Sequence, residues 1–134
     1  MSRKNKLQRF AEVSSFSHVY QNFNIGSGLL QCAGNSDISM KGKWNSHHFA
    51  NENPIVLELA CGKGEYAIGL SRLYQNKNFI GVDIKGARIW RGAKTVQQEN
   101  IKKVSFLRTK IEYIIDFFNP GEVSEIWITF DILK

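Results

Sequence analysis

The feature that most constrains this chain is a short apolar run that stops abruptly at a glycine-rich turn. Residues 55–60 read Ile-Val-Leu-Glu-Leu-Ala, and residues 61–64 read Cys-Gly-Lys-Gly. A nearly continuous apolar run of this length is typical of a strand buried on both faces, as in a parallel sheet. The two glycines end the run and predict a tight turn.

Strand and helix patterns alternate from Pro54 onward. After the strand at 55–60, the predicted elements are a helix from 66 to 73, a strand at 78–83, a helix from 84 to 100, a strand at 104–107, a helix from 111 to 118 and a strand at 125–130. This order predicts an α/β domain with a mostly parallel sheet and helices on both faces. With 134 residues in all, the chain holds one such domain, which we assign to residues 54–134.

Residues 1–53 show no comparable alternation. Leu7, Phe10, Ala11 and Val13 are spaced for one face of a short helix, but residues 23–53 are rich in Asn, Ser and Gly. We therefore expect a basic N-terminal arm that is partly irregular.

Charge is unevenly distributed along the chain. Residues 1–43 contain six Lys or Arg against two acidic residues, within a chain whose formal net charge is +6. A basic arm ahead of a nearly neutral domain favours a polyanionic partner, most commonly nucleic acid. A solubilising tail stays open as an alternative.

Other composition features narrow the functional class. No apolar run approaches the roughly 20 residues that span a bilayer, so we expect no membrane anchoring. Cys32 and Cys61 are not spaced as a CxxC pair, and reduced thiols in a cytoplasmic protein are expected. The three histidines lack partners at metal-ligand spacing, so no metal site is predicted.

The glycine turn and two acidic residues point to a cofactor site. Gly62 and Gly64 lie between a predicted strand and a predicted helix, and Asp83 ends the next strand 19 residues after Gly64. Ligands of parallel α/β sheets bind beyond the carboxyl ends of the strands, and an acid in this position accepts hydrogen bonds from ribose hydroxyls. The pattern predicts a nucleoside-containing cofactor.

The identity of that cofactor depends on Glu58. Residues 62–67 satisfy the dinucleotide pattern G-x-G-x-x-A. However, Glu58 lies at the strand end before the turn, where its carboxylate would face a pyrophosphate unfavourably. S-adenosylmethionine carries a sulfonium and an amino group and no phosphate, so it is favoured over NAD. An NAD-dependent oxidoreductase and a simple strand-to-helix turn remain as alternatives.

Several segments together resemble the tRNA (guanine-N7)-methyltransferases. Residues 57–65 are similar to the E-[IL]-G-C-G-x-G-[EN] motif of that family, and further similarity runs through residues 3–12, 79–94, 100–108 and 120–130. The resemblance implies a Rossmann-like fold and an enzyme that transfers the methyl group of S-adenosylmethionine to N7 of a guanine in the tRNA variable loop.

The resemblance also assigns cofactor-binding positions. It places Glu58 at the methionine end of S-adenosylmethionine, Asp83 at the ribose, and Gly62 and Gly64 in the cofactor loop. Lys110 stands where many members carry an acid near the adenine, so a contact there would come from its backbone. Ala60 replaces a usual glycine, and its methyl group is expected to crowd the cofactor.

The reaction implied by the resemblance needs little proton chemistry. Guanine N7 carries a lone pair and no proton, so positioning and desolvation of the reactants dominate. Asp131 is the candidate catalytic residue, because a carboxylate can stabilise the positive charge that develops on the purine. The candidate tRNA-binding residues are Arg3, Lys4 and Lys6 in the arm, and Lys85, Arg88, Arg91 and Lys94, which recur every three residues.

The sequence departs from the family pattern near its end. Residues 130–134 lack the first proline of the F-P-D-P motif, and the sequence stops at Lys134. We therefore expect that the C-terminal strands of the fold are missing. A truncated fragment that binds S-adenosylmethionine or RNA without turnover stays open as the alternative function, and the oligomeric state is not predicted.

Overall fold

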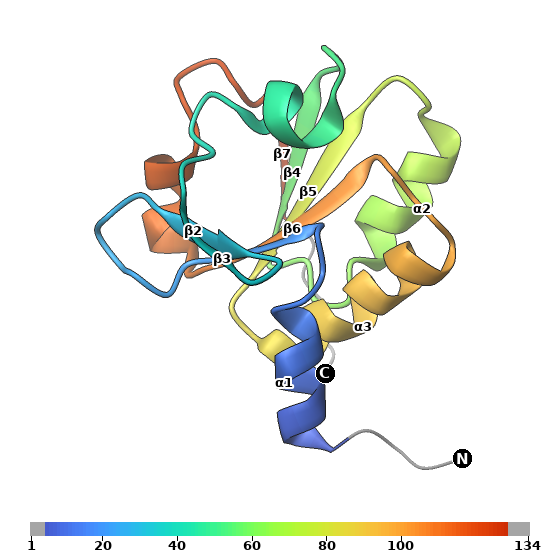
Figure 1. The fold of residues 1–134 in the computed structure, drawn as a ribbon. Coiled ribbons are helices and arrows are strands. Elements are labelled where there is room, and N and C mark those ends of the chain that lie inside the picture. The colour runs from blue at the N-terminus through green and yellow to red at the C-terminus, as the bar shows by residue number, and fades with distance from the viewer. Residues whose placement is uncertain (1–4, 129–134) are drawn as a thin grey trace.

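The computed structural model describes residues 5–128 and shows one seven-stranded mixed sheet with helices packed against it (Figure 1). The strands are β1 (Val19–Gln21), β2 (Leu30–Cys32), β3 (Asn35–Ile38), β4 (Ile55–Leu59), β5 (Asn78–Asp83), β6 (Val104–Arg108) and β7 (Glu125–Ile128). The α-helices are α1 (Lys6–Val13), α2 (Glu65–Leu73) and α3 (Gly86–Gln98). Two short segments, the π-helical η1 (Trp44–Phe49) and the 3₁₀-helical η2 (Ile111–Phe117), complete the described elements.

The predicted parallel sheet is confirmed. Strands lie in the order β3-β2-β1-β6-β5-β4-β7, and β4 pairs in parallel with both β5 and β7. The chain therefore builds outward from β4 to β5 and β6 and then returns to the other side of β4. The reversal of strand order beside β4 creates the switch point at which α/β sheets bind ligands.

The region expected as an irregular arm instead extends this sheet. Strand β1 pairs in parallel with β6, and β2 and β3 follow as an antiparallel pair. All three residues of β1 are buried. These strands are only three or four residues long, so they are too short to show alternation. Strand β1 is positioned by pairing with β6, β2 by pairing with β1, and β3 by pairing with β2.

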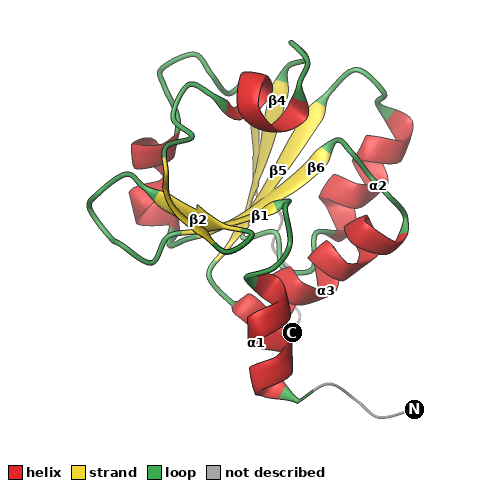
Figure 2. Cartoon of the chain, viewed as in Figure 1, coloured by secondary structure: helices red, strands yellow, loops and turns green. Residues whose placement is uncertain are grey.

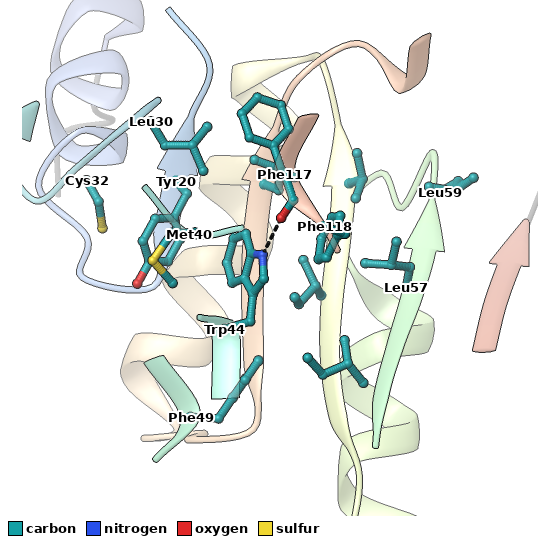
Figure 3. Packing of buried hydrophobic residues seen from close by; sticks show 14 residues of the cluster. Tyr20, Leu30, Cys32, Met40, Trp44, Phe49, Leu57, Leu59, Phe117 and Phe118 are labelled. Atoms are coloured by element: carbon teal, nitrogen blue, oxygen red, sulfur yellow. Dashed lines mark hydrogen bonds between the residues drawn. The ribbon is translucent and has the colours of Figure 1, made fainter. Parts of the chain in front are cut away.

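One face of the sheet is covered by irregular and short helical segments (Figure 3). Trp44 is fully buried there, its Nε1 donates to the carbonyl of Phe117 at 2.9 Å, and its ring stacks on Phe118 with 5.4 Å between centroids. The same cluster includes Leu57 from β4 and Met40. Met40, Trp44 and Phe49 thus anchor this segment in the core.

The opposite face is covered by α2 and α3 (Figure 2). Phe106 of β6 is fully buried between the sheet and these helices. A Cβ placed on Gly64 or on Gly92 would lie 2.8 Å from this ring. The two glycines therefore allow the start of α2 and the middle of α3 to approach the sheet closely.

Helix α1 forms where the spacing predicted a helix, but it docks through polar contacts. Leu7 is 81% exposed and only Val13 is buried. Glu12 accepts a hydrogen bond from Nε1 of Trp90 at 2.7 Å and pairs with Lys94 of α3 at 2.9 Å. The contacts place α1 beside α3 (Figure 1).

Candidate cofactor site

The carboxyl ends of β4, β5 and β6 form the candidate site. Glu58 is the penultimate residue of β4, Asp83 ends β5 and Lys110 follows β6 by two residues. Because the three strands are adjacent and parallel, these residues lie at one edge of the sheet. The structure thus brings together predicted positions that are up to 52 residues apart in the sequence.

Asp83 holds the glycine loop and the start of α3 together. Its side chain is buried, its Oδ2 accepts the backbone N–H of Gly62 at 2.9 Å, and its Oδ1 accepts that of Lys85 at 2.9 Å. Each carboxylate oxygen can accept a second hydrogen bond. Asp83 can therefore bind a ligand hydroxyl while it keeps both backbone contacts.

The loop after β4 has a left-handed backbone at three alternate positions. The φ angles are +56° at Ala60, +59° at Gly62 and +73° at Gly64. A Cβ on Gly62 would meet nothing within 4 Å, whereas one on Gly64 would meet the Phe106 ring. Gly64 is thus required for packing, and Gly62 leaves open space beside the loop for a ligand.

Glu58 and Asp83 make the surroundings of this loop negative. Both side chains are buried, at 5% and 6% exposure. Burial, followed by the charges of Glu58 and Asp83, raises the pKa of the Cys61 thiol well above its usual range. Cys61 therefore stays protonated at neutral pH and does not supply a nucleophilic thiolate. Both cysteines are buried and free of disulfide bonds.

The arrangement favours a cationic ligand over a pyrophosphate. In a dinucleotide site the loop N–H groups face phosphate oxygens, but here the N–H of Gly62 already donates to Asp83. A second buried carboxylate, Glu58, lies on the adjacent strand. Two negative groups would repel a pyrophosphate and attract a sulfonium or ammonium group.

Lys110 lies at the rim of the site. Its side chain is exposed, and its carbonyl oxygen accepts the N–H of Tyr113 at 3.1 Å and the hydroxyl of Thr109 at 3.3 Å. The carbonyl is therefore engaged within the chain, so its N–H is the better backbone group for an adenine contact.

The predicted basic residues are divided between two helices. Lys85, Arg88 and Arg91 are exposed on or beside α3, and Lys6 is exposed at the start of α1. Lys94 instead pairs with Glu12, so it serves in helix docking. Arg3, Lys4 and Asp131 lie outside the described residues.

Arg108 was not among the predicted site residues. It ends β6 opposite Asp83, and its guanidinium donates to the carbonyl of Ile84 and to Oε1 of Gln21, both at 3.0 Å. The rule that ligands bind at carboxyl strand ends would have selected this position, but the sequence alone does not show that β1 lies beside it.

Residues 5–128 contain neither a metal-binding cluster nor a membrane-spanning helix. No cluster of three or more His, Cys, Asp or Glu side chains in that range is arranged to hold a metal ion. No helix in the same range has the length and apolarity needed to cross a membrane.

Comparison with known sequences shows a clear family relationship. A family model described as "Putative methyltransferase" matches residues 52–131. A tRNA (guanine-N(7)-)-methyltransferase of Bacteroides fragilis is 53% identical over 95% of this chain and 48% of its own length. A protein of the same name from Christiangramia forsetii is 51% identical over 97% of this chain and 55% of its own length. The chain spans about half the length of these curated relatives.

Solved structures agree on the fold. The structure of an antibiotic-related methyltransferase matches with a TM-score of 0.54 at 16% identity, covering 63% of this chain and 45% of its own. A 30S ribosomal A1408 methyltransferase from an uncultured bacterium matches with a TM-score of 0.52 at 19% identity, covering 62% and 40%. These similarities confirm a Rossmann-like methyltransferase fold.

The family match favours a methyltransferase over an NAD-dependent oxidoreductase, in agreement with the two buried carboxylates at the glycine loop. The loop and both acids lie within the matched residues 52–131. The chain belongs to the methyltransferase family that this model describes, and the relatives of Bacteroides fragilis and Christiangramia forsetii are named tRNA (guanine-N(7)-)-methyltransferases.

Proposed function

We propose that this chain forms the cofactor-binding part of an S-adenosylmethionine-dependent tRNA (guanine-N7)-methyltransferase. The observation that carries the proposal is the pair of buried carboxylates, Glu58 and Asp83, beside the open backbone of Gly62. Transfer RNA is supported as the substrate by the names of relatives, such as the tRNA (guanine-N(7)-)-methyltransferase of Bacteroides fragilis, whose sequence is 53% identical.

The residues present fit the chemistry of S-adenosylmethionine. Asp83 keeps free lone pairs for the ribose hydroxyls, and Glu58 offers a negative charge to the cationic methionine end. Gly62 gives the ligand close access to the loop backbone. When bound, this cofactor supplies an electrophilic methyl group.

The protein's task in the reaction is to position and desolvate the guanine. Because N7 has a lone pair and no proton, no residue of the chain needs to act as a general base. Positive charge develops on the purine, and a carboxylate nearby lowers the barrier. Asp131, which lies outside the described residues, is proposed for this role.

The exposed cations beside the site are proposed to bind tRNA phosphates. Arg88 and Arg91 lie on α3, Lys85 is the N-cap residue of that helix, and Lys6 lies on the neighbouring α1. Arg3 and Lys4, which lie outside the described residues, are proposed to contribute further phosphate contacts. Such contacts predict binding that weakens steeply as salt rises.

A second candidate is a module that binds S-adenosylmethionine or RNA without turnover. The specific observation in its favour is that residues 130–134 lack the first proline of the F-P-D-P motif. Cofactor binding and methyl transfer therefore need separate measurements.

Calorimetry tests the cofactor site. We expect the chain to bind S-adenosylmethionine and not NAD, and Glu58→Gln to weaken S-adenosylmethionine binding about tenfold or more, because a charge-assisted contact is lost. Glu52→Gln is the matched control, since Glu52 is exposed and lies before the start of β4, at the end of the strand opposite to Glu58. Binding of NAD, or equal affinity in both variants, would contradict the proposed site.

A methylation assay separates the two candidates. The chain is incubated with tRNA transcripts and methyl-labelled S-adenosylmethionine, and labelled positions are located by cleavage chemistry specific for N7-methylguanosine. Label at guanine N7 supports the enzyme and excludes the non-catalytic module. Binding without transfer supports the module, and label on another atom contradicts the assigned specificity.

A further inference from the structure

Two aromatic side chains are exposed together at the end of the sheet that carries the cofactor site. Phe10 of α1 and Phe23, which follows β1, lie with their ring centroids 6.5 Å apart. They are 49% and 50% exposed. Phe10 and Phe23 are 13 residues apart in the sequence, so their contact is a feature of the folded chain.

Arg108 joins this aromatic pair to the site. Its guanidinium carbon lies 5.6 Å from the centre of the Phe10 ring. Its hydrogen bonds to Ile84 and Gln21 hold the guanidinium in place. In the sheet, Arg108 of β6 is the register partner of Asp83 of β5. One strand, β6, therefore separates β1, which leads into Phe23, from β5, which ends at Asp83, the acid proposed to bind the cofactor ribose.

Cations of α1 lie on the Phe10 side of the pair, and one acid, Asp37, lines a small pocket together with Phe23. Lys6 is exposed in the same helix as Phe10, and the Arg9 guanidinium lies over the Trp90 ring at 4.9 Å. The nearest acid along α1, Glu12, pairs with Lys94. Exposed aromatic rings interleaved with arginine and lysine are characteristic of single-stranded nucleic acid binding, because bases stack on the rings while cations hold the backbone.

We propose that Phe10, Phe23 and Arg108 form a stacking platform for unstacked bases of the RNA substrate that flank the methylated guanine. The inference rests on the proposed function for the identity of the RNA. Stacking is tolerant of base identity, since every base has a π face. The platform therefore contributes affinity and placement rather than sequence discrimination.

Paired variants test the platform. Phe10→Leu combined with Phe23→Leu keeps apolar volume and removes both rings. Tyr74→Leu is the matched control, because Tyr74 is 45% exposed, lies beneath the Lys77 ammonium at 4.8 Å and follows α2 at the opposite end of β5. Affinities for an unstructured RNA oligonucleotide and for tRNA are measured in the full chain over a range of salt concentrations.

We expect the double variant to bind both RNAs about tenfold or more weakly, since stacking energy is lost, with an unchanged slope of affinity against salt because no cation is removed. Tyr74→Leu should bind both RNAs like the unchanged chain, and all three proteins should bind S-adenosylmethionine equally.

Unchanged RNA affinity in the double variant would overturn the platform, and so would an equal loss in Tyr74→Leu. If the double variant still methylates guanine N7 with an unchanged KM for tRNA, the platform is overturned and the proposed function stands. Loss of RNA affinity in the double variant, in a chain that fails to bind S-adenosylmethionine, supports the platform and overturns the proposed function.

Discussion

At the residue scale, the cofactor loop contains an alanine in a backbone conformation that favours glycine. Ala60 has φ +56°, and Ala50, at the end of η1, also has φ +56°. A left-handed conformation costs an L-residue about 1–2 kcal/mol, and glycine recovers part of it. We expect Ala60→Gly and Ala50→Gly each to raise the free energy of unfolding by about 0.5–1 kcal/mol, measured by chemical denaturation.

The two alanines differ in what else the change should do. Only Ala60 borders the candidate cofactor site, so Ala60→Gly is expected to increase affinity for S-adenosylmethionine, and Ala50→Gly to leave it unchanged. Equal affinities in both variants would show that the Ala60 methyl group does not crowd the cofactor.

The half-buried His48 leads us to expect that the fold weakens in mild acid. Burial lowers the pKa of His48 to about 4, and the charge of His18 contributes a smaller effect in the same direction. The unfolded chain binds this proton near pH 6.5 and the folded chain does not, so stability is lost as the pH falls from about 6.5 toward 4. Between pH 6.5 and pH 4, the free energy of unfolding is expected to fall by about 3 kcal/mol because of His48.

His48→Asn tests this assignment, because the amide keeps a polar atom near the hydroxyl of Tyr20, which lies 2.8 Å from Nδ1. Denaturation at a series of pH values should show a flatter acid limb in His48→Asn than in the unchanged chain. Parallel curves would mean that other groups cause the acid sensitivity.

At the element scale, substitution of two helical glycines by alanine is expected to change stability in opposite directions. A Cβ on Gly92 of α3 would overlap the carbonyl oxygen of Lys63 and lie 2.8 Å from the Phe106 ring, whereas a Cβ on Gly69 of α2 would meet nothing within 4 Å. We expect Gly92→Ala to destabilise the fold by about 1–3 kcal/mol. Gly69→Ala should stabilise it by about 0.5–1 kcal/mol, because alanine favours the helix. Thermal melts of the two variants should move in opposite directions.

Elements with buried faces could be predicted from the sequence, and elements that depend on neighbours could not. The strand predicted at 78–83 has the observed bounds of β5, since its apolar run reflects burial on both faces. Strand β1 was missed because it contains polar Gln21, which is buried by pairing with β6 and by its contact with Arg108. Phe10 was expected on a packing face, but polar contacts of Glu12 set the orientation of α1.

At the scale of the whole molecule, β7 leaves an apolar edge. Among the described strands it pairs only with β4, and Ile126 and Ile128 are 61% and 56% exposed. Exposed apolar edge strands promote association between chains. We expect sedimentation velocity to show self-association of the chain that Ile126→Lys combined with Ile128→Lys reduces.

Ile115→Lys is the control, because Ile115 is 75% exposed but lies in η2, away from the edge. Persistent association in the β7 variant, or a chain that stays monomeric at high concentration, would contradict this role for the edge.

The sequence by itself determined the strand–glycine turn–helix unit, the parallel order of elements after Pro54 and the acids at the strand ends, because these depend on local composition and burial periodicity. Only the tertiary structure decided that the Asp83 carboxylate binds the Gly62 backbone, that Gly64 packs on Phe106, and that Phe10 meets Phe23 beside the site. These contacts join segments through strand pairing and helix docking, and no local pattern encodes which distant residues will meet.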